Sequence, residues 1–370
     1  FNETLNRGVE ILDNVLKNTK SRVIDGRTAF LLYDTYGFPL DLTADICREK
    51  GFDLDEIGFE TEMRGQREKA RTSNKFKFAA TFECSDPETN FVGYDNSCTR
   101  GTIISIFKNN LSVKSAIAGE HILLTLSQSC FYAESGGQVG DIGNLKTDNA
   151  NVKITNTTKI ANNVYLHHGL VEFGEIRIQQ SGNLQIDEVN RTNIKRNHSA
   201  THLLHLALKK TLGNHVQQKG SLVNSERTRF DFSHPNILTN DQIRKVETIV
   251  NSEILENTET SVDLMEYPDA LKSGAVALFG EKYTDKVRVL TIGTSKELCG
   301  GTHVSRTGDI GFFKIVHETG VSSGVRRVEA VTGKNAFEFI QETDTLLKQV
   351  SSIVKTPVKK LNDKINDIVE

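Results

Sequence analysis

The sequence predicts an α+β protein with several domains: a helical region, an antiparallel β-barrel, a two-layer α+β domain and a C-terminal helical stub. Three observations predict this fold class. Apolar residues recur at helical spacing up to about residue 80, and short alternating runs separated by Gly and Asn follow to about 185. Long helical patterns then mix with strands up to about 335. A chain of 370 residues can hold two or three domains with their own cores, so we expect segments at 1–90, 91–185, 186–335 and 336–370.

The first segment is expected to be helical. Apolar spacing predicts helical stretches at 8–16, 29–33, 41–50 and 57–72. The Gly37-Phe38-Pro39 sequence breaks the second stretch, and Gly51 ends the third. These stretches predict a small bundle of short helices.

The second segment has the pattern of an antiparallel barrel. Short, partly alternating runs lie at 102–107, 121–126, 152–155 and 164–168. The glycine-rich stretch 135–143 interrupts this pattern, and on spacing alone it is a glycine-rich hairpin.

The third segment predicts a layer of helices on a sheet. A helix is expected at 197–212, with Asn197 as its N-cap and Gly213 as the residue that ends it. A second helix is expected at 239–256, with strands at 228–232, 287–292, 312–316 and 325–331. After Asn335 the apolar spacing predicts helices broken near Pro357, which fit either a coiled-coil lead-in or a two-helix hairpin.

Two short motifs carry the chemistry of this sequence. His198 and His202 are four residues apart, and so are Cys299 and His303. On a helix, residues at this spacing share one face, and Cys and His are the ligands that zinc prefers, four of them making a tetrahedral set. The alternative is a buried free cysteine with histidines satisfied in the core. His205 is a rival ligand on the same predicted helix, ranked below the pair at i and i+4.

The residues around these motifs narrow the chemistry. Gly300 and Gly301 suit a tight turn that brings Cys299 and His303 round one centre. The residue after the first histidine is Ser199, whereas a zinc protease helix carries a glutamate there as general base. A protease is therefore disfavoured.

Charge and cysteine content limit the class of protein. The net charge of −3 argues against binding nucleic acid over the whole surface but allows basic faces. One such face is the stretch 64–77, which is either an RNA contact or a solvated helix end, and another is Arg326-Arg327. The five scattered cysteines fit reduced intracellular thiols, and the chain has no run of about 18 apolar residues, so no membrane segment is expected.

Several blocks of the sequence resemble a known family. The blocks RNHSATHLLHLALKKTLGNHVQQKGSLV (196–223), ELCGGTHVSRTGDIGFFKIVHETGVSSGVRRVEAVTG (297–333) and FYAESGGQVGDIG (131–143) look like the editing domain of alanyl-tRNA synthetase. The block GRTAFLLYDTYGFPLDLTADICREKGFDLD (26–55) resembles the tRNA-recognition region of that synthetase. Free-standing trans-editing proteins share the editing domain but lack this fourth block.

The resemblance implies a reaction and a set of site residues. The reaction is hydrolysis of the ester that joins a wrong amino acid, serine or glycine, to the 3′ end of alanine tRNA. The resemblance implies one Zn²⁺, for which we expect His198, His202 and Cys299 as firm ligands and His303 as fourth ligand or water-positioning group. Gln218 is then a pocket residue that orients water or substrate, where spacing alone would make it a surface residue, and Thr201 is placed to read a serine hydroxyl. The resemblance also makes 135–143 the loop that faces the editing cleft.

For RNA contacts the resemblance implies recognition of the acceptor stem by the first segment. Asp41 is a candidate minor-groove reader, although a helix N-cap is the simpler role. Arg67, Arg71 and Lys75 in the basic stretch, together with Arg326 and Arg327, are candidate backbone contacts.

The expected protein is an internal fragment of a cytoplasmic synthetase. The chain starts with Phe1, ends inside a helical pattern, and lacks a GxGxGxxxR-type segment, so we expect neither ATP binding nor alanine activation. The whole protein could be oligomeric through a further C-terminal domain. Two alternatives stay open: a free-standing aminoacyl-tRNA deacylase, and a non-catalytic RNA-binding module with structural zinc.

Overall fold

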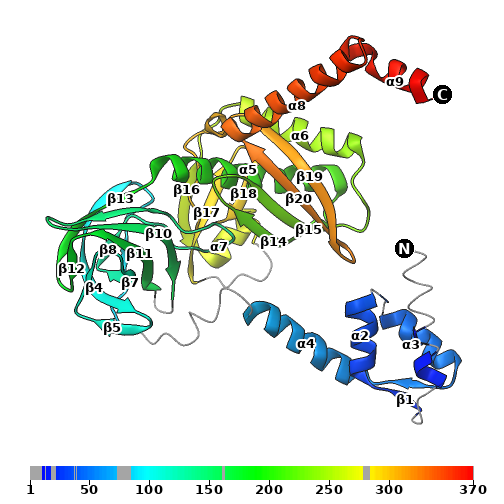
Figure 1. The fold of residues 1–370 in the computed structure, drawn as a ribbon, viewed down its shortest axis with the longest axis horizontal. Helices are drawn as coiled ribbons and strands as arrows, with labels where there is room; N and C mark the ends of the chain where they lie inside the picture. The colour runs from blue at the N-terminus through cyan, green and yellow to red at the C-terminus, as the bar shows by residue number, and fades with distance from the viewer. Residues whose placement is uncertain are drawn as a thin grey trace. The chain divides into compact units, whose positions relative to one another are not determined.

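The computed structural model describes residues 11–12, 14–17, 22–36, 38, 40–72, 85–160, 163–277 and 284–369. The chain forms two compact units, 1–84 and 85–370 (Figure 1). The described residues have the predicted α+β architecture. None of their helices is long and apolar enough to cross a membrane.

The first unit is a set of short helices, as the apolar spacing predicts. Its elements are β1 (Val23–Ile24), α2 (Gly26–Tyr36), α3 (Leu40–Glu49), β2 (Asp53–Leu54) and α4 (Glu56–Thr72), with β1 and β2 pairing in parallel. Residues 11–12 and 14–17 are helical too. Helices α2 and α4 cross closely, because a Cβ added at Gly26 would lie 2.1 Å from the backbone nitrogen of Phe59. Helix α2 ends at Tyr36 and α3 begins at Leu40, on either side of the predicted break.

The second unit begins with a closed antiparallel barrel (Figure 1). Its six strands, in spatial order, are β13 (Ser181–Ile186), β9 (Gly143–Lys146), β10 (Asn151–Lys159), β11 (Tyr165–Phe173), β7 (His121–Leu126) and β4 (Cys98–Lys108). The barrel closes because β13 also pairs with β4. Short flanking strands are β3 (Asn90–Phe91), β5 (Leu111–Val113), β6 (Ser115–Ile117), β8 (Gln128–Ser129) and β12 (Glu175–Arg177). Three of the four predicted runs lie within barrel strands, and the fourth, 164–168, starts one residue before β11.

The glycine-rich stretch forms a tight hairpin, as its spacing predicts. The backbones of Ser135 and Gln138 exchange two hydrogen bonds of 3.2 and 3.0 Å. Gly136 and Gly137 between them both have positive φ, 58° and 84°, which is the conformation of a two-residue turn that favours glycine. A Cβ at Gly137 would lie 2.7 Å from the Ser221 carbonyl oxygen, so the hairpin packs closely on the next part of the unit.

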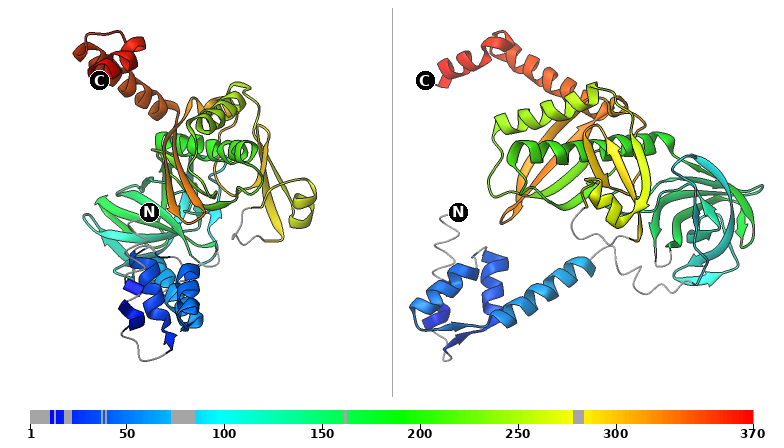
Figure 2. Two further views of the ribbon diagram at one scale, coloured as in Figure 1. Left: turned by 90° about the vertical axis from the view of Figure 1, so that its right-hand side faces the viewer. Right: turned by 180° about the vertical axis from the view of Figure 1, so that it is seen from behind.

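An α+β layer pair follows the barrel. Helices α5 (Glu188–Leu212) and α6 (Asn240–Leu255) lie side by side on one face of a four-stranded sheet (Figure 2). The strand order of this sheet is β14 (Gln218–Val223), β15 (Thr228–Ser233), β20 (Val325–Thr332) and β19 (Phe313–Ser322). A smaller sheet contains β16 (Ser261–Glu266), β17 (Lys286–Ile292) and β18 (Ser295–Leu298), next to the short helix α7 (Tyr267–Lys272). Buried Leu204, Leu208, Phe230, Val250 and Phe313 belong to the common core.

One predicted helix boundary is wrong. Helix α5 starts at Glu188, nine residues before the predicted N-cap, and Asp187 caps it by accepting a 2.9 Å hydrogen bond from the Asn190 N–H. Asn197 lies inside the helix and is buried; its amide donates to the Asn224 carbonyl and accepts from the Thr332 hydroxyl. The polar composition of 188–196 hid the first turns, although buried Arg191 and Ile194 mark their inner face. The predicted end is confirmed, since α5 stops at Leu212 before Gly213, which has φ of 114°.

The C-terminal helices match the expected break. Helix α8 (Gly333–Ile353) and helix α9 (Leu361–Val369) flank Pro357. Ala336 is buried near the start of α8, whereas Phe337, Leu346 and Ile353 further along are exposed.

Candidate metal centre and its cavity

Helix α5 supplies two of the predicted ligands. His198 and His202 lie one turn apart, and both side chains are buried, with 5% and 4% of their surface exposed. Because the helix extends nine residues further back than predicted, this pair lies in its middle and not at its end. A regular helix on both sides fixes the direction of both rings.

The loop after β18 supplies the other two. The Cys299 N–H donates to the Arg288 carbonyl at 3.1 Å, which continues the pairing of β18 with β17. The turn then passes so close to α5 that a Cβ at Gly301 would lie 2.1 Å from Cε1 of His198. A Cβ at Gly300 would meet no atom within 4 Å. Of the two glycines, Gly301 is therefore the one that the close approach requires.

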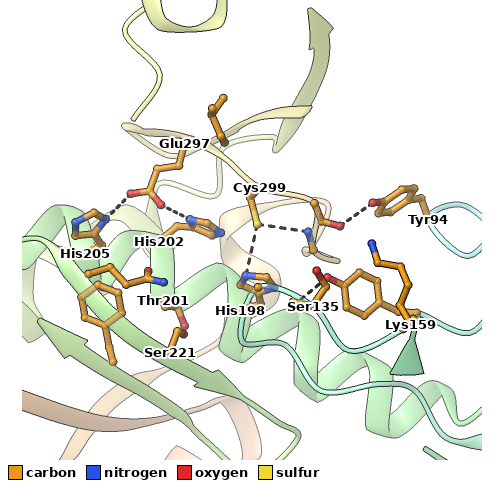
Figure 3. A pocket seen from close by; sticks show the side chains of 18 of the residues that line it. Tyr94, Ser135, Lys159, His198, Thr201, His202, His205, Ser221, Glu297 and Cys299 are labelled. Carbon is orange, nitrogen blue, oxygen red and sulfur yellow. Dashed lines mark hydrogen bonds and ion pairs between the residues drawn. The ribbon is translucent and has the colours of Figure 1, made fainter. Parts of the chain in front are cut away.

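Four ligand atoms converge at this point, and Figure 3 shows three of the residues, His198, His202 and Cys299. One atom each from His198, His202, Cys299 and His303 lies within 4.8 Å of the other three. Cys299 Sγ is 3.5 Å from Nε2 of His198 and 3.5 Å from Nε2 of His303. His202 Nε2 is 3.2 Å from His303 Nε2. The two motifs, about a hundred residues apart in sequence, thus form one group that could hold a metal ion.

Second-layer hydrogen bonds orient the two helical histidines. Nδ1 of His202 lies 2.6 Å from Oε2 of Glu297, and Nδ1 of His198 lies 2.7 Å from Oε1 of Gln138. Each bond uses the outer ring nitrogen and turns Nε2 toward the common centre. Carboxylates and carbonyls behind metal-binding histidines commonly have this role, because they fix the ring and its tautomer.

His205 is brought near the group but not into it. Its Nδ1 lies 2.7 Å from Oε1 of Glu297, so one carboxylate holds both His202 and His205. Its ring is absent from the converging set.

The electrostatics of the centre favour the metal-binding forms of Cys299 and His303 but not that of His202. Burial raises the pKa of the Cys299 thiol, but the three neighbouring histidine rings hold that pKa well below its ordinary value. Burial lowers the pKa of His303 to about 3 in spite of the nearby sulfur. Burial would also lower the pKa of His202, yet Cys299 and Glu297 raise it to about 10. A thiolate and a neutral imidazole bind metal directly, whereas His202 must lose a proton when an ion binds.

A cavity of about 170 Å³ opens beside these ligands. Gln218, at the start of β14, and Thr201, on α5, both line it, as do His198, His202 and Cys299. The hairpin residues Ser135 and Gly136 line the cavity too. The glycine-rich stretch is therefore a hairpin, as its spacing predicts, and it also forms part of the cavity wall.

The sequence missed the two residues that support the histidines. Gln138 lies in the hairpin, where its side chain also accepts from the Thr302 N–H at 2.9 Å and donates to the Thr302 hydroxyl at 2.9 Å. Glu297 is two residues before Cys299, and alternate residues of a strand share one face, so this spacing could have identified it. No local pattern identifies Gln138, because its partners lie 60 and 164 residues away.

The candidate RNA contacts lie elsewhere. Arg326 donates from Nε to Glu318 at 2.6 Å, and Arg327 makes two hydrogen bonds to Asp231, of 2.7 and 2.8 Å. Both guanidinium charges are therefore matched by a carboxylate.

The candidates in the first unit are only partly described. Asp41 follows Leu40 in the first turn of α3, so it is not the N-cap that the simpler interpretation assigned. Arg67 and Arg71 belong to α4, but their side chains lie outside the described part of the chain, and so does the whole of Lys75.

Comparison with known proteins defines the class first. The family described as tRNA synthetases class II (A) matches residues 1–190. The family described as "Threonyl and Alanyl tRNA synthetase second additional domain" matches residues 287–329, the stretch that contains Cys299 and His303.

The relatives specify the family further. The chain is 49% identical, over its whole length, to an alanine–tRNA ligase of Cupriavidus necator and to another of Nitrosospira multiformis, and 48% identical to that of Bordetella avium. It therefore belongs to the alanyl-tRNA synthetase family, and the match over 1–190 favours the synthetases over the free-standing editing proteins. The chain spans 43% of the length of the first of these relatives.

Proposed function

We propose that this chain hydrolyses the ester that joins serine or glycine to the 3′ end of alanine tRNA. One observation carries the proposal: four Cys and His ligand atoms converge, and three of their residues, His198, His202 and Cys299, line a cavity that Gln218 and Thr201 also line. Family membership supplies the substrate class. A pocket for alanine cannot strongly reject glycine, which is smaller, or serine, which adds one hydroxyl, so a second, hydrolytic site supplies the missing selectivity.

Zinc is the ion that fits the donor set best. One thiolate and up to three imidazole nitrogens are its usual ligands, and a carboxylate and an amide behind His202 and His198 complete a typical second layer. We assign His198, His202 and Cys299 as ligands, with His303 as fourth ligand or as the residue that positions water. A bound zinc ion supplies a Lewis acid or a water molecule with a pKa near 7.

Gln218 and Thr201 bind and sort the substrate in this proposal. The Gln218 amide can donate to a carbonyl or orient water, but it cannot act as a base at neutral pH. The Thr201 hydroxyl donates to the Asn197 carbonyl at 2.7 Å, and its oxygen lies 2.6 Å from the Thr228 hydroxyl. Its proton is already used, so Thr201 can offer a serine hydroxyl only an acceptor oxygen.

The four segments of the chain have different roles in this proposal. Residues 1–90 recognise the acceptor stem, 91–185 form the barrel, 186–335 carry the editing reaction, and 336–370 form a helical extension. Asp41 is the proposed minor-groove reader, and Arg67, Arg71 and Lys75 contact the RNA backbone. Arg326 and Arg327 rank below them, because each is paired with a carboxylate.

The test is a deacylation time course with purified chain and Ser-tRNA for alanine. In the Cys299→Ala variant we expect the rate to fall by at least about 100-fold and zinc content to drop from roughly one per chain, since even second-layer changes cost 10- to 100-fold. Cys98→Ala, at an exposed cysteine, is the matched control and should keep both.

Two outcomes would count against a catalytic metal. Hydrolysis at the parental rate in Cys299→Ala would refute it. Loss of the folded state on metal removal, followed by circular dichroism, would favour the RNA-binding module with structural zinc instead.

A further inference from the structure

The cavity beside the metal centre has a second wall, which comes from the barrel. Tyr94, Tyr132, Tyr165 and Lys159 line the same cavity as His198 and Cys299. Figure 3 shows Lys159 and Tyr94 on the same side of the cavity. These residues contain no metal ligand, and the hydrolytic chemistry described above does not use them.

The three tyrosines form a fixed aromatic surface. Each packs on Phe91, with ring centroids 5.0, 6.2 and 5.6 Å away for Tyr94, Tyr132 and Tyr165. The Tyr94 hydroxyl donates to the Gly300 carbonyl at 2.6 Å, and the Tyr132 hydroxyl donates to the Ser135 carbonyl at 3.3 Å. Arg288 covers Tyr94, with its guanidinium carbon 3.6 Å from the ring centroid. Rings held in this way are pre-organised for stacking.

Tyr165 differs from the other two tyrosines. Among the described residues its hydroxyl has no hydrogen-bond partner, although the ring is held by Phe91. Burial raises the pKa of this phenol to about 12, so it stays neutral at physiological pH.

Lys159 is the cationic residue of the wall. It ends β10, is exposed, and is the one lysine or arginine among the described residues that line the cavity. No described carboxylate forms an ion pair with its ammonium group. A lysine without a partner beside aromatic rings is the combination with which proteins bind single-stranded nucleic acid, the charge meeting a phosphate and the rings meeting a base.

A neighbouring cavity does not offer the same chemistry. This second cavity, of about 260 Å³, is also lined by Tyr94, but it contains Asp95 and Glu188 as well as Lys195 and Arg191. Arg191 is already bound to a carboxylate. Mixed charge disfavours an RNA backbone there.

We propose that the barrel wall is the subsite for the last nucleotide of the tRNA 3′ end, with Lys159 on its phosphate and Tyr165 against its base. This inference rests on the proposed hydrolysis, because an ester held at His198 and Cys299 brings its ribose, base and phosphate into the cavity that Lys159 and Tyr165 also line. Lys159 and Tyr165 are thus substrate-binding residues that set KM and leave the hydrolytic step unchanged.

The first test compares two substrates in the Lys159→Gln variant of the full chain. With Ser-tRNA we expect KM to rise about tenfold at unchanged kcat, as for removal of one charge-assisted hydrogen bond. The log–log salt dependence of binding should flatten by about 0.7, the value for one phosphate of a single strand. With 3′-O-seryl adenosine, which has no phosphate, KM should not change. Lys153→Gln, an exposed lysine of the same strand outside the cavity, is the control and should behave like the parent with both substrates.

The second test removes the ring of Tyr165 and keeps apolar volume. Tyr165→Leu should raise KM for both substrates, roughly 5- to 100-fold if one base stacks on the ring, and Tyr165→Phe should restore most of the loss. Unchanged KM in Tyr165→Leu would overturn the base contact. Equal effects of Lys159→Gln and Lys153→Gln, or an effect of Lys159→Gln on seryl adenosine, would overturn the phosphate contact.

Failure of the proposed hydrolysis gives a different result. If the parent chain hydrolyses neither substrate, the proposed function fails. The affinity of each variant for an RNA hairpin that ends in CCA then tests the proposed subsite by itself. Weaker binding by Lys159→Gln than by Lys153→Gln supports it, and equal binding overturns it.

Discussion

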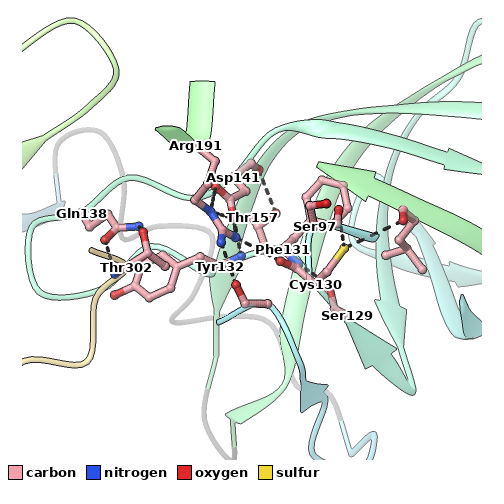
Figure 4. A network of polar contacts seen from close by, with 12 residues as sticks. Ser97, Ser129, Cys130, Phe131, Tyr132, Gln138, Asp141, Thr157, Arg191 and Thr302 are labelled. Carbon is pink, nitrogen blue, oxygen red and sulfur yellow. Dashed lines mark hydrogen bonds and ion pairs between the residues drawn. The ribbon is translucent and has the colours of Figure 1, made fainter. Parts of the chain in front are cut away.

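Helix α5 carries two buried polar clusters, and they differ in how their hydrogen-bonding groups are used. Near its start, Arg191 donates to the Asp141 carboxylate and to the carbonyls of Gly93 and Cys130, at 2.7 and 3.0 Å (Figure 4). Asp141 in turn accepts from the Tyr132 N–H at 2.6 Å. This cluster joins the helix to the barrel, and each of its charged groups has a protein partner.

Seven residues further along, in the second or half-used cluster, only one ring nitrogen of each helical histidine bonds to a supporting residue. His198 and His202 each bond one ring nitrogen to the protein, through Gln138 and Glu297, and their other nitrogens meet Cys299 and His303. Buried polar groups are normally satisfied by the surrounding protein, whereas these four ligand atoms have chiefly one another as partners, an arrangement that suits an ion or a ligand. The comparison separates a cluster whose groups all have protein partners from a cluster that could hold a metal ion, although both are buried on one helix.

The largest predicted effect is on stability, at the satisfied cluster. Arg191→Met leaves Asp141 charged, buried and unpaired, with 1% of its side chain exposed, so we expect unfolding free energy to fall by about 3–5 kcal/mol. Urea unfolding of the second unit measures it. Arg196→Met, on the same helix and partly exposed, is the control and should cost less than about 1 kcal/mol. Equal losses in the two variants would mean that the ion pair has no special structural role.

A buried and hydrogen-bonded histidine in the barrel predicts that the protein loses stability at acid pH. The expected loss is smaller than that in Arg191→Met. His167 is fully buried between the Ser129 hydroxyl and the Leu124 carbonyl, and burial lowers its pKa to about 4. In the unfolded chain a histidine titrates near 6.5, so between these values the unfolded state binds more protons. Stability is therefore full above about pH 6.5, falls by about 3 kcal/mol as the pH drops to 4, and falls no further through this group.

The measurement is the slope of unfolding free energy against pH between 4 and 6.5. His167→Gln should be less stable at neutral pH and should lose most of that slope. A slope that persists in the variant would assign the acid sensitivity to other groups.

At the half-used cluster we expect a loss of metal affinity instead. Glu297→Gln weakens the acceptor behind His202, so zinc affinity should fall about 10- to 100-fold, and the metal-free chain should lose some stability too because the buried His202–Glu297 pair is broken. Competition with a chelator measures the affinity. Glu253→Gln, a carboxylate on α6 that contacts Thr294, is the control. The contrast between the clusters disappears if Glu297→Gln unfolds the chain or if Arg191→Met releases zinc from the folded state.

Local patterns predicted much of the fold and the four residues whose side chains converge. Strand 121–126 matches β7 residue for residue. Helix 239–256 differs from α6 by one residue at each end. Its start was predictable because Thr239 forms a capping box with Gln242. Spacing at i and i+4 was enough for His198 and His202. Closure of the barrel by β13 and β4, and the contact of Gln138 with His198, depend on residues far apart in sequence. The start of α5 was missed because a charged first turn carries little apolar periodicity.

The smallest effect is expected at basic residues that already have partners. Arg326 and Arg327 are held by Glu318 and Asp231, so they contribute little free positive charge to a phosphate backbone. Replacing either with Gln should change tRNA affinity less than about twofold and leave its salt dependence as it was. Replacing Arg67, Arg71 and Lys75 with Ala should flatten the log–log salt slope by about one unit for each phosphate that the variant no longer binds.

These two sets of variants test whether the distinction between the clusters of α5, namely whether a polar group already has a protein partner, also applies to basic residues elsewhere in the chain. Filter binding over a range of salt concentrations, with a tRNA for alanine, measures both sets. Single-turnover deacylation at saturating enzyme should remain at the parental rate in each, because backbone contacts position the RNA and do not take part in hydrolysis. A clear loss of salt dependence in Arg326→Gln or Arg327→Gln would mean that RNA displaces their carboxylate partners, so that a satisfied group in the free chain still binds the substrate. In that case the presence or absence of a protein hydrogen-bond partner would indicate the role of a residue only in buried clusters. There, neither solvent nor a ligand can take the place of that partner.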